Sequence, residues 1–207
     1  MHPSKEELTG LALGTIDGLA HLKECSANLT KLQLHGGKMT GAGLANFKDC
    51  RELAQLLLHG VDAGTAGLEN FSQCRKLTLL YLAGSPLEGV SLASFAGCTE
   101  LERLDVRNTG MSGAELVHFK DCTKLKGVDL NRVQSLGKEE MAHLKGCLQL
   151  EWLNVGETDV DDEALGFLHG CKELTYLNIA HTKVTDEFVK ALQESLPDCE
   201  ITRKPLW

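Results

Sequence analysis

Cysteines recur along this 207-residue chain at a nearly constant interval. From Cys25 to Cys171 successive cysteines lie 24 or 25 residues apart, and the last, Cys199, follows after 28. Self-similarity at such a period is typical of repeat proteins, in which each repeat is one small unit that stacks on its neighbours. Neither a disulfide framework nor a catalytic cysteine requires this regularity. The spacing therefore predicts a solenoid.

A second pattern keeps the same period. Each cysteine from Cys50 to Cys171 precedes L-x-x-L-x-L, with Val or Ile in some places, and a seventh copy after Cys25 is displaced by one residue. Alternate side chains of L-x-L point to one face, which predicts a short strand. The linking segments have helical spacing, with apolar residues six and three positions before each cysteine. Four of the residues three before a cysteine are phenylalanines, and we expect them to stack beneath the helices: Phe47, Phe71, Phe95 and Phe119.

With these motifs the chain resembles the leucine-rich-repeat family. It is most similar to a bacterial, GALA-like subtype with cysteine-containing repeats of about 24 residues, and the segment 174–186, with Thr182, Val184 and Thr185, follows that pattern closely. The resemblance covers residues 25–201. It implies an α/β leucine-rich-repeat solenoid, with a curved parallel β-sheet on the concave face and short helices on the convex face. Similar repeats occur alone or fused to signalling domains, which leaves the partner unspecified.

The repeats account for nearly the whole chain. We expect a single domain over residues 1–207, with an N-terminal cap and truncated repeat over 1–28, seven repeats over 29–195 and a C-terminal cap over 196–207. The first residues lack the apolar core of a signal peptide, and no stretch approaches the roughly 20 apolar residues that cross a bilayer. These observations predict a cytoplasmic protein with no membrane partner.

The net charge of −8 disfavours a phosphate backbone as partner, and the Lys and Arg residues form no run that could follow one. We therefore expect no nucleic acid partner.

Three groups of residues invite a chemical role. A linear column of cysteines does not surround a zinc ion as paired C-x-x-C motifs do, so we expect small buried residues there. The acidic run 157–163 lacks the spacing of a calcium loop and suits the start of a helix. His35 and His59 occupy equivalent positions, which suits either a pH-sensitive or metal-binding pair or two solvated repeat residues. We predict no catalytic residue, no metal and no cofactor.

Residues that alternate with the buried leucines should project from the open face of the sheet. Three of the four Trp and Tyr residues do so, and exposed Trp, Tyr and Arg are common anchors of protein interfaces. Short strands also favour aromatics, and Arg and Asp there can simply pair with each other. The predicted partner-binding residues are Leu57, Leu79, Tyr81, Arg103, Asp105, Arg107, Asp129, Arg132, Trp152 and Tyr176.

The sequence thus favours a non-catalytic module that binds a protein or peptide on the concave sheet face, as a monomer rather than a homo-oligomer. The alternative is a structural, self-associating solenoid, joined through Leu57, Leu79 and Tyr81 or through an open end. An enzyme comes third, because it would require one reactive cysteine of low pKa.

Overall fold

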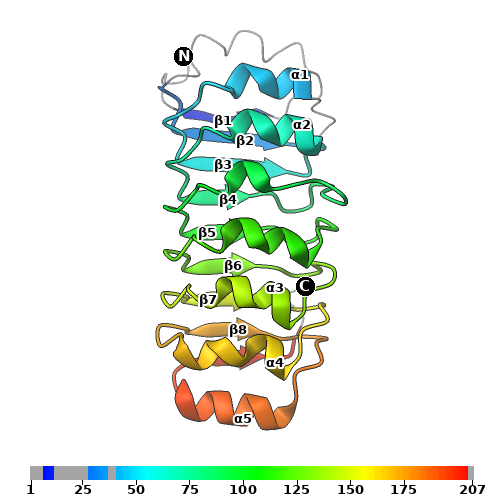
Figure 1. Cartoon of the computed structure of the whole chain (residues 1–207), viewed down its shortest axis with the longest axis vertical. Coiled ribbons are helices and arrows are strands. Elements are labelled where there is room, and N and C mark those ends of the chain that lie inside the picture. Colours follow the sequence, from blue (N-terminus) through cyan, green and yellow to red (C-terminus); the bar gives the residue numbers. More distant parts are fainter. Residues whose placement is uncertain (1–6, 12–27, 37–40, 205–207) are drawn as a thin grey trace.

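The repeats stack in single file, so that each strand lies beside the strand of the next repeat (Figure 1). This computed structural model describes residues 7–11, 28–36 and 41–204. The described residues form one parallel sheet of nine strands in chain order. The strands are β1 (Glu7–Leu11), β2 (Lys31–His35), β3 (Gln55–His59), β4 (Leu79–Tyr81), β5 (Arg103–Asp105), β6 (Gly127–Asp129), β7 (Trp152–Asn154), β8 (Tyr176–Asn178) and β9 (Glu200–Thr202).

The register of the sheet follows the repeat. Leu56 of β3 pairs with Leu80 of β4, which in turn pairs with Leu104 of β5, so equivalent positions of successive repeats form straight columns. These three leucines are buried, as the L-x-L alternation predicts. The leucine-rich-repeat solenoid is therefore confirmed as the fold.

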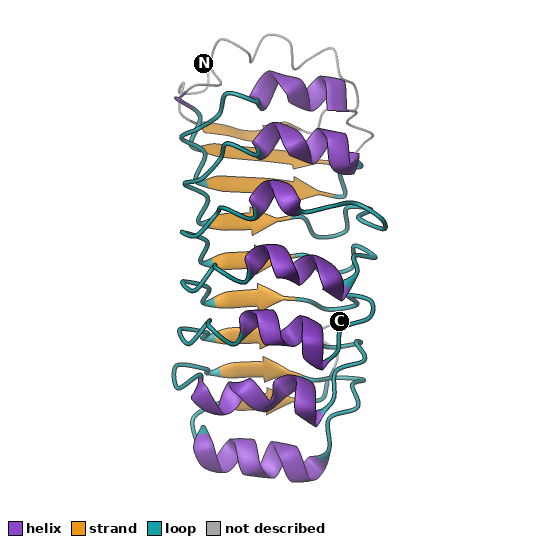
Figure 2. Cartoon of the chain, in the orientation of Figure 1, coloured by secondary structure: helices purple, strands orange, loops and turns teal. Residues whose placement is uncertain are grey.

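Short helices cover one face of the sheet and leave the other open (Figure 2). Most are a single turn, because each linking segment has only enough residues to cross back to the next strand. The last helix, α5, is the longest and lies at the end of the stack. The helices are α1 (Gly41–Leu44), η2 (Ala45–Phe47), α2 (Gly64–Leu68), η3 (Glu69–Phe71), η4 (Ala93–Phe95), η5 (Gly113–Phe119), α3 (Lys138–Met141), η6 (Ala142–Leu144), α4 (Asp162–Leu165), η7 (Gly166–Gly170) and α5 (Asp186–Ser195), where η marks a 3-10 helix.

The core lies between the helices and the sheet. Its largest members are the four phenylalanines predicted to stack, and all four are completely buried. The rings of Phe47 and Phe71 are 6.4 Å apart and nearly parallel, which is a favourable stacking geometry. Replacing a buried Phe by Ala typically costs about 3–5 kcal/mol, so this column fixes the stacking of the repeats.

The cysteines form a buried hydrogen-bonded column. The Cys74 thiol donates to the Cys50 carbonyl at 3.0 Å, and the Cys98 thiol donates to the Cys74 carbonyl at 3.3 Å. Burial raises the pKa of the Cys74 thiol to about 12, so it stays protonated at neutral pH. The seven cysteines of the described part are all unpaired, and Cys25 lies outside it. The prediction of small buried residues is confirmed for all seven, although the Cys199 thiol donates to the Glu200 carbonyl and does not continue the column.

Hydroxyl side chains cap two of the helices. Ser112 caps η5 and Thr185 caps α5, each accepting a hydrogen bond from a backbone N–H. The Glu115 carboxylate, three residues after Ser112, accepts from the N–H of Leu92 in the preceding repeat. A side chain can thus cap the neighbouring repeat as readily as its own.

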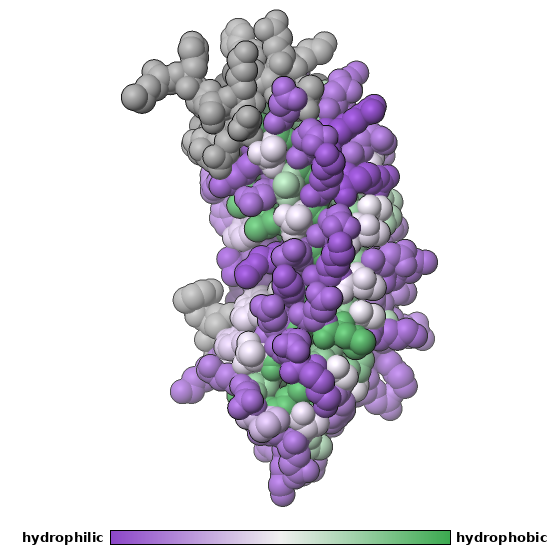
Figure 3. All heavy atoms as spheres, turned by 90° about the vertical axis from the view of Figure 1, so that its left-hand side faces the viewer, coloured by the Kyte–Doolittle hydropathy of each residue, from purple (hydrophilic) through white to green (hydrophobic). Residues whose placement is uncertain are grey.

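The edge at which the strands begin is mainly hydrophilic (Figure 3). Ion pairs between successive repeats line it, such as Lys76 with Glu52 and Lys124 with Glu100. All four side chains are about half exposed, and exposed pairs contribute only about 0–1 kcal/mol each. These pairs contribute little to stability, and they leave this edge well hydrated.

Candidate functional site: the open face of the sheet

The open face presents the side chains that alternate with the buried leucines. Because strands β2 to β9 pair in the same register, these side chains form columns that run along the stack. Tyr81, Trp152 and Tyr176 stand in these columns and are each partly exposed, as the alternation predicts. No helix of the described residues is long and apolar enough to cross a membrane.

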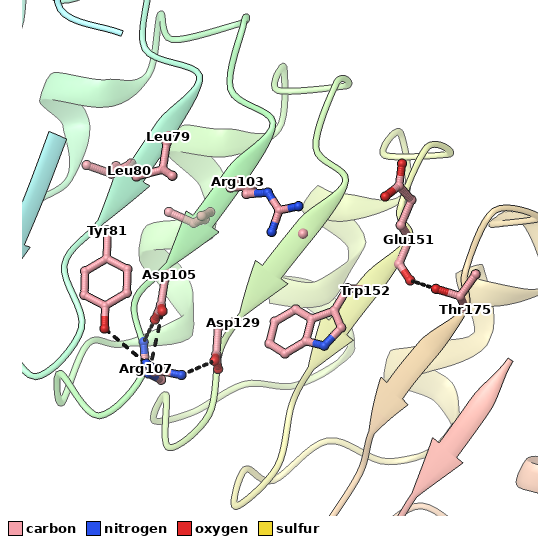
Figure 4. A pocket seen from close by; sticks show the side chains of 12 residues that line it. Leu79, Leu80, Tyr81, Arg103, Asp105, Arg107, Asp129, Glu151, Trp152 and Thr175 are labelled. Carbon is pink, nitrogen blue, oxygen red and sulfur yellow. Dashed lines mark hydrogen bonds and ion pairs between the residues drawn. The ribbon is translucent and has the colours of Figure 1, made fainter. Parts of the chain in front are cut away.

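A hollow of about 440 Å³ lies on this face between β4 and β8 (Figure 4). Its volume falls within the range of small ligand pockets, about 300–1,000 Å³, and therefore suits one or two side chains of a partner. Five of its lining residues were not among those predicted from the sequence: Leu80, Leu104, Gly127, Glu151 and Thr175. Seven of the ten predicted partner-binding residues do line it: Leu79, Tyr81, Arg103, Asp105, Arg107, Asp129 and Trp152.

Arg107 organises one wall of the hollow. Its guanidinium contacts Asp129 at 3.3 Å and Asp105 at 3.6 Å, and it donates a hydrogen bond to the Tyr81 hydroxyl at 3.1 Å. The same group lies 5.8 Å from the centre of the Tyr81 ring, within cation–π range. Arg107 therefore fixes Tyr81 and joins β4, β5 and β6 on the open face.

The two carboxylates beside Arg107 are electrostatically unusual. Burial and then the nearby Asp129 raise the pKa of Asp105 to about 6, although Arg107 opposes the shift. Burial also raises the pKa of Asp129. This wall thus carries a charge that changes with pH near neutrality.

Asp105 and Asp129 have a second, structural task that the sequence did not reveal. Each carboxylate accepts a hydrogen bond from the backbone N–H two residues later, at 3.1 and 3.0 Å. Asn154 and Asn178 make the same bond in the next two repeats. Asn154 also donates to Asp129 at 3.0 Å. These four side chains stabilise the turns that follow their strands. The two aspartates that line the hollow therefore also fix the backbone beside it.

The opposite wall is aromatic. The rings of Trp152 and Tyr176 are 5.8 Å apart and inclined by only 7°, so they stack across β7 and β8. Between this stack and Tyr81 stands Arg103, which is exposed. Within the described part of the chain the Arg103 side chain makes no hydrogen bond or ion pair, in contrast to that of Arg107. Its guanidinium is therefore exposed and available.

Two predicted residues line other parts of the surface. Leu57 lines a neighbouring hollow with His35, His59 and Tyr81. Arg132 lies in the turn after β6, beyond the strand, where it pairs with Glu157 at 2.8 Å. The structure therefore separates Arg132 from the hollow, even though its position in the sequence is close to Asp129.

The candidate metal sites gain no support. His35 and His59 lie side by side with ring centres 5.9 Å apart, but no group of three or more His, Cys, Asp or Glu side chains suited to a metal occurs in the part of the chain that the structure describes. The acidic run 157–163 is occupied with protein partners instead. For example, Asp161 caps α4 and Asp159 pairs with Lys183.

Comparison with known proteins places the fold and leaves the family open. No protein-family model and no curated protein matches the chain. Among solved structures, an internalin (inlF) of Listeria monocytogenes shares 20% identity with a TM-score of 0.71, over 86% of this chain and 48% of that one. An internalin C2 (inlC2) of the same species shares 22% identity with a TM-score of 0.68, over 87% of this chain and 73% of that one. At these identities the likeness shows a common fold. The chain spans about half the length of the first of them.

Proposed function

We propose that this chain is a non-catalytic protein-interaction module that binds a protein or peptide on the open face of its sheet. The observation that carries the proposal is the stacked pair Trp152–Tyr176 beside the unpaired Arg103 side chain. Trp, Tyr and Arg dominate binding energy at protein interfaces, because they bury a large area and retain polar contacts. A fold that needs only its buried side to be stable gains little by exposing them.

The hollow supports a protein or peptide partner over an enzyme's substrate. Its polar groups at Arg107, Asp105 and Asp129 are already bonded to one another or to backbone, which leaves them no obvious task in catalysis. The cysteines of the described residues are buried thiols, and burial raises the pKa of Cys122, for example, to about 12. A reactive cysteine needs a lowered pKa and access to solvent.

The test is a pull-down from the source organism's lysate with full-length chain. The triple variant Trp152→Ala, Tyr176→Ala and Arg103→Ala should fold and lose the partners that wild type captures. The matched control is Val117→Ala, which removes an exposed apolar side chain from the helix-covered side. The control should capture the same partners as wild type. Capture that survives in the triple variant would reject this face.

Self-association is the second candidate, and the observation that favours it is the apolar content of the neighbouring hollow, with Leu57 and Tyr81 partly exposed. Sedimentation velocity at several concentrations separates the two candidates. A monomer at all concentrations supports binding of a different partner, whereas a mass that doubles with concentration and returns to that of a monomer in Leu57→Asp supports self-association.

We also propose that the chain works in a reducing compartment such as the cytoplasm and belongs to the bacterial, GALA-like repeat subtype. Unpaired buried cysteines throughout the described part suit a reducing environment. Alkylation of the protein immediately on cell lysis in denaturant, followed by mass spectrometry, should find all its cysteines as free thiols. A disulfide-linked fraction would contradict this location.

A further inference from the structure

One position interrupts the column of the open face that the first residues of the strands form. In that column Arg103 pairs with Gly127, Gly127 pairs with Trp152, and Trp152 pairs with Tyr176. Gly127 is the one member of the column without a side chain. A Cβ placed on Gly127 would meet only Arg103 within 4 Å, at 3.7 Å from its Cγ and 4.0 Å from its Nη1, so Trp152 does not reach this position. The Arg103 side chain lies over Gly127, which is buried. The column therefore has a notch one residue wide beside Trp152, covered by the Arg103 side chain (Figure 4).

The size of the notch suits one planar side chain. Neighbouring strands are about 4.8 Å apart, so the strands of Arg103 and Trp152 are about 9.6 Å apart. The Arg103 side chain makes no hydrogen bond or ion pair within the described residues, so it can turn back over its own strand. A ring then inserted midway would lie about 4.8 Å from each strand, which falls within the range for aromatic pairs, about 4.5–7 Å, and for a cation over a ring, about 6 Å. On its other side Trp152 is already held by Tyr176. The indole is therefore pre-organised to stack.

The chemistry of the two walls selects the same kind of group. Arg103 carries a guanidinium without a partner in the described residues, and the face of an aromatic ring carries the negative part of its quadrupole. A neighbouring arginine already shows this geometry, because Arg107 lies 5.8 Å from the Tyr81 ring centre. We propose that the notch above Gly127 receives one exposed aromatic side chain of the partner, held between Trp152 and Arg103.

This inference rests on the proposed function and specifies its anchor. The probe is a random linear 12-residue peptide library displayed on phage and panned against the immobilised full chain. Enriched peptides should share a Phe, Tyr or Trp, and replacing that residue by Leu in a synthetic copy should weaken binding at least tenfold. Gly127→Leu should weaken binding at least tenfold, because it fills the notch. Long side chains already stand on both sides of Gly127, so the fold should persist.

Two matched variants complete the test. Gly127→Ala adds a single carbon at an ordinary contact distance from Arg103 and should change affinity less than threefold. Arg103→Gln lies at an exposed position and needs no repacking. It should weaken binding two- to fivefold, with Arg103→Lys restoring part of it. Peptides that carry no aromatic residue, or that bind Gly127→Leu as well as wild type, would contradict the proposal that the notch binds an aromatic side chain.

The outcomes also separate this inference from the proposed function. Peptides that ignore Gly127→Leu but lose affinity with Leu79→Asp, at the other side of the same hollow, would leave the open face as the binding surface and remove the notch. Peptides unaffected by both variants, or no enrichment above background, would count against both.

Discussion

The two halves of the solenoid close their turns in different ways. One column of the open face consists of Gln33 in β2, Leu57 in β3 and Tyr81 in β4. Three residues after each of them comes a glycine with positive φ: Gly36, Gly60 or Gly84. From β5 to β8 the same position holds Asp105, Asp129, Asn154 or Asn178, and three residues later a non-glycine residue has positive φ: Asn108, Arg132, Glu157 or His181.

The column residue and the residue with positive φ both change type between β4 and β5, which indicates a physical link between them. A left-handed conformation costs about 1–2 kcal/mol for a residue with a Cβ, and glycine avoids this cost. An Asp or Asn side chain that accepts the N–H two residues later stabilises the turn and offsets the strain at the third. Asp129, for example, accepts from the N–H of Asn131, and the next residue, Arg132, has a φ of 60°. One backbone shape is thus reached by two means.

The largest effect is expected for the buried side chain that connects two turns. Asn154→Leu should lower the free energy of unfolding by about 2–4 kcal/mol, because the N–H of Gly156 and the carboxylate of Asp129 both lose a partner. Gln33→Leu at the equivalent N-terminal position should change it by about 0.5 kcal/mol or less. Urea unfolding measures both, and equal losses would show that the two halves do not differ.

The C-terminal half should also respond to pH. The pKa of Asp105 is raised to about 6 in the folded chain, so the folded state holds the proton more tightly than the unfolded state does. The contribution of Asp105 to stability should therefore be greatest below about pH 4 and fall by about 1–3 kcal/mol as the pH rises through 6. The measurement is the difference in unfolding free energy between wild type and Asp105→Asn at several pH values. A difference that grows in favour of wild type above pH 6 would contradict the sign.

At the turn position three residues after Gln33, Leu57 and Tyr81, glycine should be indispensable only in the N-terminal half. Gly60→Ala should cost about 1–2 kcal/mol, because φ at this position is 63° while the space around it is open. Arg132→Ala, at the equivalent position, should cost about 0.5 kcal/mol, since a Cβ is already present there. Gly166→Ala, at a helical φ with open space, should be neutral or slightly stabilising. Similar costs for Gly60→Ala and Gly166→Ala would show that backbone strain does not cause the loss of stability at position 60.

The smallest effect tests the link between the two positions. In a Leu57→Asn background the cost of Gly60→Asn should fall by about 0.5–1 kcal/mol, because the amide introduced at position 57 could accept the N–H of His59 as its C-terminal counterparts do. A double-mutant cycle by thermal or urea unfolding gives the coupling. No coupling would mean that the two changes along the chain are independent.

The features that the sequence predicted correctly are properties of a repeated position. The burial of the leucines, the phenylalanine column and the cysteine column each follow from period and alternation, which determine what a residue faces. The turn bonds of Asp129 and Asn154 could have been read the same way, because Asp or Asn fills that column in four successive repeats.

Other features depend on side-chain conformation and do not recur from repeat to repeat. That Arg107 reaches both Asp105 and Asp129, while Arg103 reaches neither, follows from the directions of two similar side chains. That Arg132 leaves the hollow follows from where β6 ends. The notch at Gly127 is an absence of a side chain, which stands out only when the register of the columns is known.

Photo-crosslinking tests the claim that the open face holds a partner most directly. A benzoyl-phenylalanine in place of Leu79, which lines the hollow, is compared with one in place of Val117 on the helix-covered side, each in the full chain exposed to source lysate. The account predicts that position 79 forms a discrete crosslinked species which the Trp152, Tyr176 and Arg103 triple variant abolishes, and that position 117 forms none. Discrete crosslinks from position 117 alone would contradict it.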